Sequence, residues 1–173
     1  WAQQRVPEGD LRLQDYRDTR EQFDHVVSIE MFEAVGERWW PTYFKTIARA
    51  LKPGGRAVVQ SITIRDDLFA DYRKGTDFIQ QYVFPGGMLP SRSAFRAAAA
   101  RQGLAVRGEY AFGTDYARTL ADWRLAFEAS WPQIAALGFD EPFRRLWRMY
   151  LCYCEAAFLA GNIDVVHFEL GHH

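Results

Sequence analysis

The sequence places reactive side chains in short clusters at or near the ends of apolar runs. Glu33, Ser61–Thr63, the pair Asp15–Tyr16 and the segment Gly113–Tyr116 are such clusters. In open α/β sheets, ligands bind beyond the carboxyl ends of the strands, so clusters that follow different strands meet at one edge. Together they predict one polar pocket. Taken singly, each also fits ordinary polar residues at a strand end.

Glu33 is the strongest candidate among these residues. It lies between Met31–Phe32 and Ala34–Val35, which predicts partial burial. A buried carboxylate needs hydrogen-bond partners or has a raised pKa. The alternative is that Glu33 only caps the helix that follows. For Tyr116 the alternative is a structural phenol within a turn.

Cysteine and histidine contents exclude several kinds of site. Cys152 and Cys154 are too close for an unstrained disulfide, and Cys154 also fits a small core residue of a helix. His25 and His167 lie in strand patterns without ligand spacing, so no zinc site is predicted. The sequence has no P-loop or GxGxxG motif.

Composition limits the class of protein. Lys and Arg number 21 against 22 Asp and Glu in 173 residues, which argues against a nucleic-acid binder. Aromatic residues make up 16%, which indicates either a large apolar pocket or a dense core.

No apolar run is long enough to span a membrane, no signal peptide is recognised, and two cysteines favour a cytoplasmic location. Because the chain starts at Trp1, we interpret it as a fragment.

A strand–helix–strand unit is the clearest prediction of structure. Phe23–Ile29 is a β-branched run, Glu37–Leu51 has helical spacing, and Arg56–Ile64 is a second apolar strand. Pro53–Gly55 separates the helix from this strand. The pattern predicts an α/β domain with a parallel pair of strands.

The remaining elements extend this domain, and residues 65–91 are interpreted as a lid or insertion outside the sheet. His172–His173 are interpreted as a tag remnant. The other expected elements are strands at Leu11–Gln14, Leu104–Phe112 and Ile163–Leu170 and helices at Ser91–Gln102, Leu120–Trp131 and Phe139–Leu159, with the tail of a helix at residues 1–5.

Six segments, in order along the chain, resemble the cyclopropane-fatty-acyl-phospholipid synthase family, which includes mycolic-acid cyclopropane synthases and fatty-acid methyltransferases. The resemblance covers Leu11–Leu170. The segments are Val27–Gly36, Leu51–Gly55, Tyr82–Ser91, Gly113–Leu120, Trp131–Pro132 and Tyr150–Phe158.

This resemblance implies a Rossmann-like class I methyltransferase sheet of strand order 3-2-1-4-5-7-6, of which this chain would supply strands 3 to 7. It also implies methyl transfer from S-adenosylmethionine to a cis double bond of a lipid acyl chain. A bound bicarbonate then removes a proton so that a cyclopropane ring closes. Such chemistry requires a dry site that holds the reactants in line.

The resemblance also assigns candidate residues. The bicarbonate pocket falls on Glu33, the backbone of Ile62 and Tyr116, and a cysteine sometimes assigned to the active site falls on Cys154. The family's histidine falls on Gln60, which cannot become cationic or relay a proton. This departure leaves a methyl or methylene branch open as the product.

The cofactor site is only partly represented. Asp15 and Tyr16 match the loop beside the adenine ring, and the strand end Ser28, Ile29 and Glu30 also matches. The Gly-rich loop that holds the methionine part of the cofactor, of the type D-x-G-C-G-W-G, does not occur in this chain. A catalytically inactive lipid-binding remnant of the fold is therefore the rival interpretation.

The expected partners are an acyl chain and the inner membrane face, contacted peripherally, and no nucleic acid. An exposed apolar edge along Phe23–Ile29 is expected to recruit a second copy or residues outside the chain. The acyl chain is expected in an apolar groove lined by Phe78, Tyr82, Phe84, Trp123, Phe127, Trp147 and Tyr150.

We expect the chain alone to be inactive and to bind S-adenosylmethionine weakly, because the Gly-rich loop is missing from it. Isothermal titration of the 173-residue chain with the cofactor checks this. Micromolar binding by the monomeric chain would contradict it.

Overall fold

The structure is a computed structural model, and it describes residues 2–173. Four strands form one sheet in the order β1-β2-β4-β3, in which β1 and β2 are parallel and the other pairs are antiparallel. The elements are α1 (Ala2–Arg5), η1 (Tyr16–Asp18), β1 (Phe23–Ile29), α2 (Phe32–Val35), η2 (Glu37–Trp39), α3 (Trp40–Ala50), β2 (Leu51–Ile64), α4 (Asp66–Tyr72), α5 (Phe78–Tyr82), α6 (Arg92–Ala100), β3 (Leu104–Ala111), α7 (Gly113–Ala129), α8 (Trp131–Ala136), α9 (Glu141–Leu159) and β4 (Ile163–His172).

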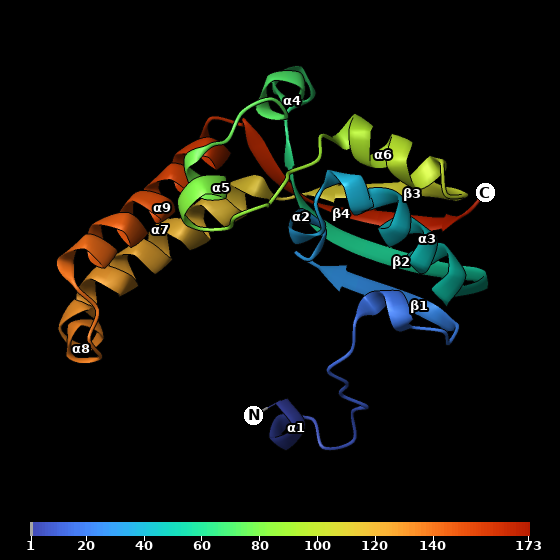
Figure 1. The fold of residues 1–173 in the computed structure, drawn as a ribbon, viewed down its shortest axis with the longest axis horizontal. Coiled ribbons are helices and arrows are strands. Elements are labelled where there is room, and N and C mark those ends of the chain that lie inside the picture. Colours follow the sequence, from blue (N-terminus) through green and yellow to red (C-terminus); the bar gives the residue numbers. More distant parts are fainter. Residues whose placement is uncertain (1) are drawn as a thin grey trace.

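Helices α3 and α6 cover one face of the sheet (Figure 1). Alternate residues of β2 point to that face, so Val59 and Ser61 are buried while Gln60 lies on the opposite face. The core on the covered face is rich in aromatic rings, and Phe95 of α6 stacks on Phe168 of β4 with the ring centres 3.9 Å apart. This core explains much of the aromatic content.

Helices α7 and α9 form an antiparallel pair that extends away from the sheet, with α8 at its far end (Figure 1). A second, smaller core lies between this arm and the sheet. It contains Leu120 of α7, Leu151 and Phe158 of α9, and Val165 of β4. Residues 65–91 carry α4 and α5, and Phe78 of α5 packs against Tyr153 of α9.

The predicted α/β class and the parallel β1–α3–β2 unit are confirmed. The order β1-β2-β4-β3 corresponds to 4-5-7-6 of the expected sheet. Within the described residues, β1 is an edge strand whose Val27 side chain is 66% exposed, as expected. His172, interpreted as part of a tag, completes β4.

Two local predictions are wrong. Leu11–Gln14 is not a strand, since none of the described strands pairs with it, and Leu13 is fully exposed. The segment Gly113–Tyr116 is not a turn but the first turn of α7, which begins seven residues before the predicted helix start at Leu120. The cause is a long-range bond, since Asp164 of β4 accepts the Gly113 N–H at 2.7 Å.

Leu170→Ala should lower the free energy of unfolding by about 2–5 kcal/mol, because Leu170 is fully buried and its loss leaves a cavity. Leu137→Ala is the matched control, since Leu137 is 79% exposed. Urea denaturation of both variants measures the difference. Equal losses would contradict the placement of the core.

Candidate functional site

Glu33 accepts hydrogen bonds from β2 at the edge of the sheet. Its Oε1 atom accepts the Ile62 N–H at 2.5 Å and the Ser61 hydroxyl at 3.0 Å. The Oε2 atom is buried and has no hydrogen-bond partner among the described residues. Burial raises the pKa of Glu33, and the hydrogen bonds from Ile62 and Ser61 only partly oppose this effect. Glu33 is therefore a carboxyl group with a raised pKa and one buried oxygen that lacks a hydrogen-bond partner.

Glu30 is the centre of a second group of hydrogen bonds. Its Oε1 atom accepts the Tyr116 hydroxyl at 2.7 Å and the Gln60 side-chain amide at 2.9 Å. Gln60 Oε1 in turn lies 2.7 Å from His167 Nε2. Residues from β2, β4, α7 and the turn after β1 thus meet at one place.

Tyr116 stays protonated in this environment. Burial, the hydrogen bond to Glu30 and the negative charges of Glu30 and Glu33 all raise the pKa of Tyr116 far above its usual value. Its ring packs against Phe158 with the ring centres 5.3 Å apart. Gly113 allows this first turn of α7 to approach β4, because a Cβ atom at Gly113 would lie 2.5 Å from Asp164 Oδ1.

Cys154 does not join these hydrogen bonds. It is half-buried on α9 beside the smaller core and makes no hydrogen bond among the described residues. Burial raises the pKa of its thiol to about 12. A thiol that stays protonated at neutral pH is a poor nucleophile, so the structure favours the alternative role of Cys154 as a packing residue.

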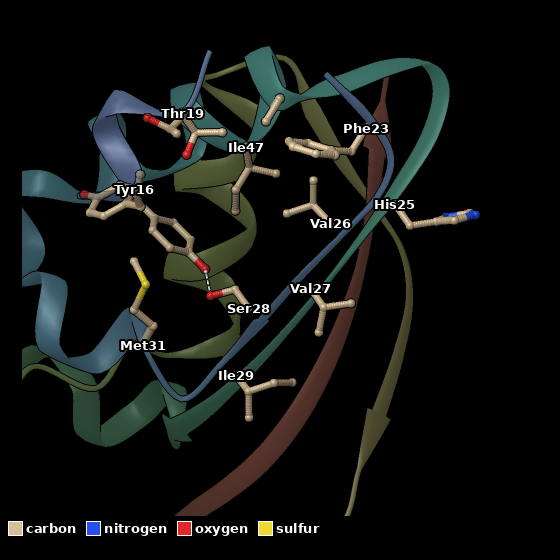
Figure 2. A pocket seen from close by; sticks show the side chains of 13 residues that line it. Tyr16, Thr19, Phe23, His25, Val26, Val27, Ser28, Ile29, Met31 and Ile47 are labelled. Atoms are coloured by element: carbon tan, nitrogen blue, oxygen red, sulfur yellow. Dashed lines mark hydrogen bonds between the residues drawn. The ribbon is translucent and has the colours of Figure 1, made fainter. Parts of the chain in front are cut away.

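A groove of about 460 Å³ lies beside β1, apart from the hydrogen-bonded group. Figure 2 shows Tyr16, Ser28 and Met31 around it, with Val26 and Ile47 on its apolar wall. The Ser28 hydroxyl accepts the Tyr43 hydroxyl at 2.7 Å. Three of the five residues predicted to bind the cofactor, Tyr16, Ser28 and Ile29, line this groove.

The other two predicted cofactor residues lie elsewhere. Asp15 pairs with Arg17, which lowers the pKa of Asp15 to about 2, and its side chain begins η1. Glu30 belongs with Gln60 and Tyr116 rather than with the groove.

The expected apolar groove near Tyr116 is not confirmed. Neither the hollow beside β1 nor a polar one of about 160 Å³ near Arg92 and Asp164 is lined by Tyr116. Most of the predicted groove residues instead touch other rings. Tyr150 contacts both Phe84 and Trp147, and Trp147 stacks on Phe143.

Sequence reasoning missed the hydrogen-bonding role of His167 and the contact of Ser28 with Tyr43. His167 has no metal-ligand spacing in the sequence, yet it is the cross-strand partner of Gln60. The antiparallel pairing of β2 with β4 is the signal that would have revealed it. Among residues 2–173, no group of three or more His, Cys, Asp and Glu is arranged to hold a metal ion.

Glu33→Gln should remove a pH dependence of stability. Since the pKa of Glu33 is raised in the folded state, its ionisation destabilises the fold as pH rises above the ordinary value near 4.5. The stability of the variant relative to the parent should therefore increase from pH 4 to pH 7. Urea denaturation across this range measures it, with Glu8→Gln at an exposed position as control. A constant difference would contradict a raised pKa.

Comparisons with known proteins identify the family of this chain. The family model of mycolic acid cyclopropane synthetase matches residues 2–168. Tuberculostearic acid methyltransferase UfaA1 of Mycobacterium tuberculosis is 41% identical over 93% of this chain and 38% of its own length. Cyclopropane-fatty-acyl-phospholipid synthase of Escherichia coli is 38% identical over 90% of this chain and 39% of its own length.

A solved structure, that of mycolic acid cyclopropane synthase CmaA1 complexed with SAH and CTAB, matches with a TM-score of 0.86 and 28% identity. The match covers 98% of this chain and 64% of that chain. This chain thus spans about two-fifths of the length of the curated relatives named above. The family match and the shared fold together show that the chain belongs to the mycolic acid cyclopropane synthetase family.

Proposed function

We propose that this chain is part of an enzyme that transfers a methylene unit from S-adenosylmethionine to the cis double bond of a lipid acyl chain, forming a cyclopropane ring. The observation that carries the proposal is the buried carboxylate of Glu33, with Oε2 unpartnered, beside the hydrogen-bonded pair Glu30–Tyr116. One relative is named a cyclopropane-fatty-acyl-phospholipid synthase and the other a methyltransferase, so both names support transfer of a one-carbon unit.

The reaction needs a base in a dry place. S-adenosylmethionine supplies an electrophilic methyl group when it is bound. The π electrons of the alkene would form the new C–C bond while the S–C electron pair is left on sulfur, and the resulting carbocation would have to lose a proton for the ring to close. Glu33 is suited to hold this proton at Oε2, because burial raises its pKa and the other oxygen is already fixed by β2.

The residues beside β1 fit part of the cofactor. The groove has an apolar wall and the polar rim of Tyr16 and Ser28, which suits a flat adenine ring. The unpartnered Glu33 oxygen would be an acceptor for the one O–H that bicarbonate has to donate. When bound, it would supply a proton acceptor close to the substrate. The Tyr116 hydroxyl donates to Glu30, and the Ile62 N–H donates to Glu33. Each donor would have to leave its present acceptor to bind the ion.

The aromatic rings of the arm suit an acyl chain. Tyr150, Trp147 and Phe143 of α9 are in consecutive ring contact, and Phe139, which precedes α9, continues the row. Each buried CH₂ group of a fatty chain contributes about 0.8 kcal/mol. The row starts near Glu30, whose charge acts on Tyr150, and it leads toward the end of the arm.

A peripheral membrane location is part of the proposal, with the enzyme at the cytoplasmic face. Leu137 and Phe139, close to the end of the arm, are exposed apolar side chains that suit contact with a lipid surface. No described helix is long and apolar enough to cross a bilayer.

A methyl or methylene branch is the second candidate product. Gln60 leaves it open, because an amide cannot relay a proton as a histidine can. A methylene branch still requires loss of one proton from the carbocation, and a saturated methyl branch requires a separate hydride donor instead. The relative that is 41% identical is itself named a tuberculostearic acid methyltransferase, not a cyclopropane synthase. A catalytically inactive remnant is disfavoured by the retention of Glu33, and of Tyr116 near enough for the Glu33 charge to act on it.

Tyr116→Phe should lower kcat of the full-length enzyme by roughly 10²-fold, since it removes a hydroxyl donor from the site. Tyr110→Phe on β3 is the control, because Tyr110 is exposed and outside the hydrogen-bonded group. Mass spectrometry of host lipids shows the product as a gain of CH₂ for a ring or a methylene, with two further hydrogens for a saturated branch. NMR separates ring from methylene, and unmodified lipids would support the inactive remnant.

A further inference from the structure

Gln60 and His167 face each other across the sheet. They are directly opposed in the antiparallel register of β2 and β4, and both side chains lie on the face away from α3 and α6. His167 Nε2 lies 2.7 Å from Gln60 Oε1. Both residues are half-buried, so the contact is partly shielded from water.

The direction of this hydrogen bond follows from the rest of the group. The Gln60 amide nitrogen donates to the Glu30 carboxylate at 2.9 Å, so the amide oxygen must face the imidazole. A carbonyl oxygen only accepts hydrogen bonds, so His167 Nε2 must carry a proton. The reverse amide orientation would place the Gln60 oxygen against the Glu30 carboxylate, which is repulsive.

The imidazole ring is itself held in place. Phe112 packs edge-on against the imidazole, with the ring centres 4.8 Å apart. Tyr110, on the neighbouring strand β3, also lies beside the imidazole, with the ring centres 6.2 Å apart. The ring orientation therefore does not depend on the bond to Gln60 alone. This packing lets His167 impose its geometry on the amide.

We propose that His167 is a positioning residue that fixes the Gln60 amide with its N–H groups toward Glu30. The two donors on Glu30, from Gln60 and Tyr116, then hold this carboxylate in one place at the site. The inference rests on the proposed function, because its consequence for catalysis presupposes methyl transfer at this site. Its structural part, the protonated Nε2 of His167, is independent of any activity.

The first test is spectroscopic. Nitrogen NMR of the side chains should show His167 as a tautomer with hydrogen on Nε2, and Gln60→Leu should shift the His167 signals. His172→Gln is a matched control on the same strand, because His172 contacts Leu51 O and not Gln60. A neutral ring with hydrogen on Nδ1 alone would overturn the inference, whether or not the protein transfers methyl groups.

The second test is kinetic, on the full-length enzyme. His167→Leu should lower kcat by about tenfold or more, with little change in KM for the lipid, since one directing hydrogen bond is lost. His167→Gln, which again offers an N–H, should recover most of the rate. The exchange Gln60→His with His167→Gln keeps one amide and one imidazole in the pair and should be more active than His167→Leu.

Unfolding midpoints of these variants separate positioning from folding. A rate loss in His167→Leu that His167→Gln does not relieve, at equal stability, would overturn the positioning role. Absence of methyl transfer by the parent enzyme would instead refute the proposed function, and the NMR result would still decide the inference.

Discussion

The site depends on a backbone donor that the sheet leaves unpaired. The parallel pairing of β1 with β2 ends at Ile29 and Gln60, while β2 continues to Ile64. The Ile62 N–H therefore extends beyond the end of its neighbour strand, and a buried donor must find another acceptor. Glu33 supplies that acceptor from the first turn of α2. The unequal ends of β1 and β2 thus fix the Glu33 carboxylate at this edge of the sheet.

Two cores meet at this point. The larger one packs α3 and α6 on the sheet, and the smaller one joins the α7–α9 arm to Ile62 and Val165. Glu33 is held by the strand and turn that border the larger core, whereas Tyr116 belongs to the arm. The hydrogen bond from Tyr116 to Glu30 is consequently a link between two packing units, and a small shift of the arm would change the phenol position while Glu33 stayed in place.

The sequence predicted those elements whose pattern is local. The run Phe23–Ile29 became β1 without change, and Ser91 caps α6 as expected, because β-branched residues and capping side chains act on their own neighbours.

Leu11–Gln14 has the alternation of a strand, yet alternation does not supply a partner strand. The start of α7 depends on Asp164, 51 residues away, and the Gln60–His167 pair depends on strand register. Spacing along the chain shows neither. The contact of Glu33 with the Ile62 N–H agrees with the prediction that strand ends on one edge lie together, but Glu30 as the acceptor for Tyr116 was not predictable.

Glu30 combines an uncommon backbone with its place in the hydrogen-bonded group. Its φ of +49° makes it the one non-glycine residue with positive φ in the described part of the chain, and its N–H bonds to Gln60 O at 3.0 Å. A left-handed conformation costs an ordinary residue about 1–2 kcal/mol. Glycine or asparagine would relieve this cost, but either would remove the carboxylate that Tyr116 and Gln60 bind. Position 30 therefore tolerates few substitutions. Variants selected for thermal stability that replace Glu30 are expected to gain stability and to lose the hydrogen bonds of the site.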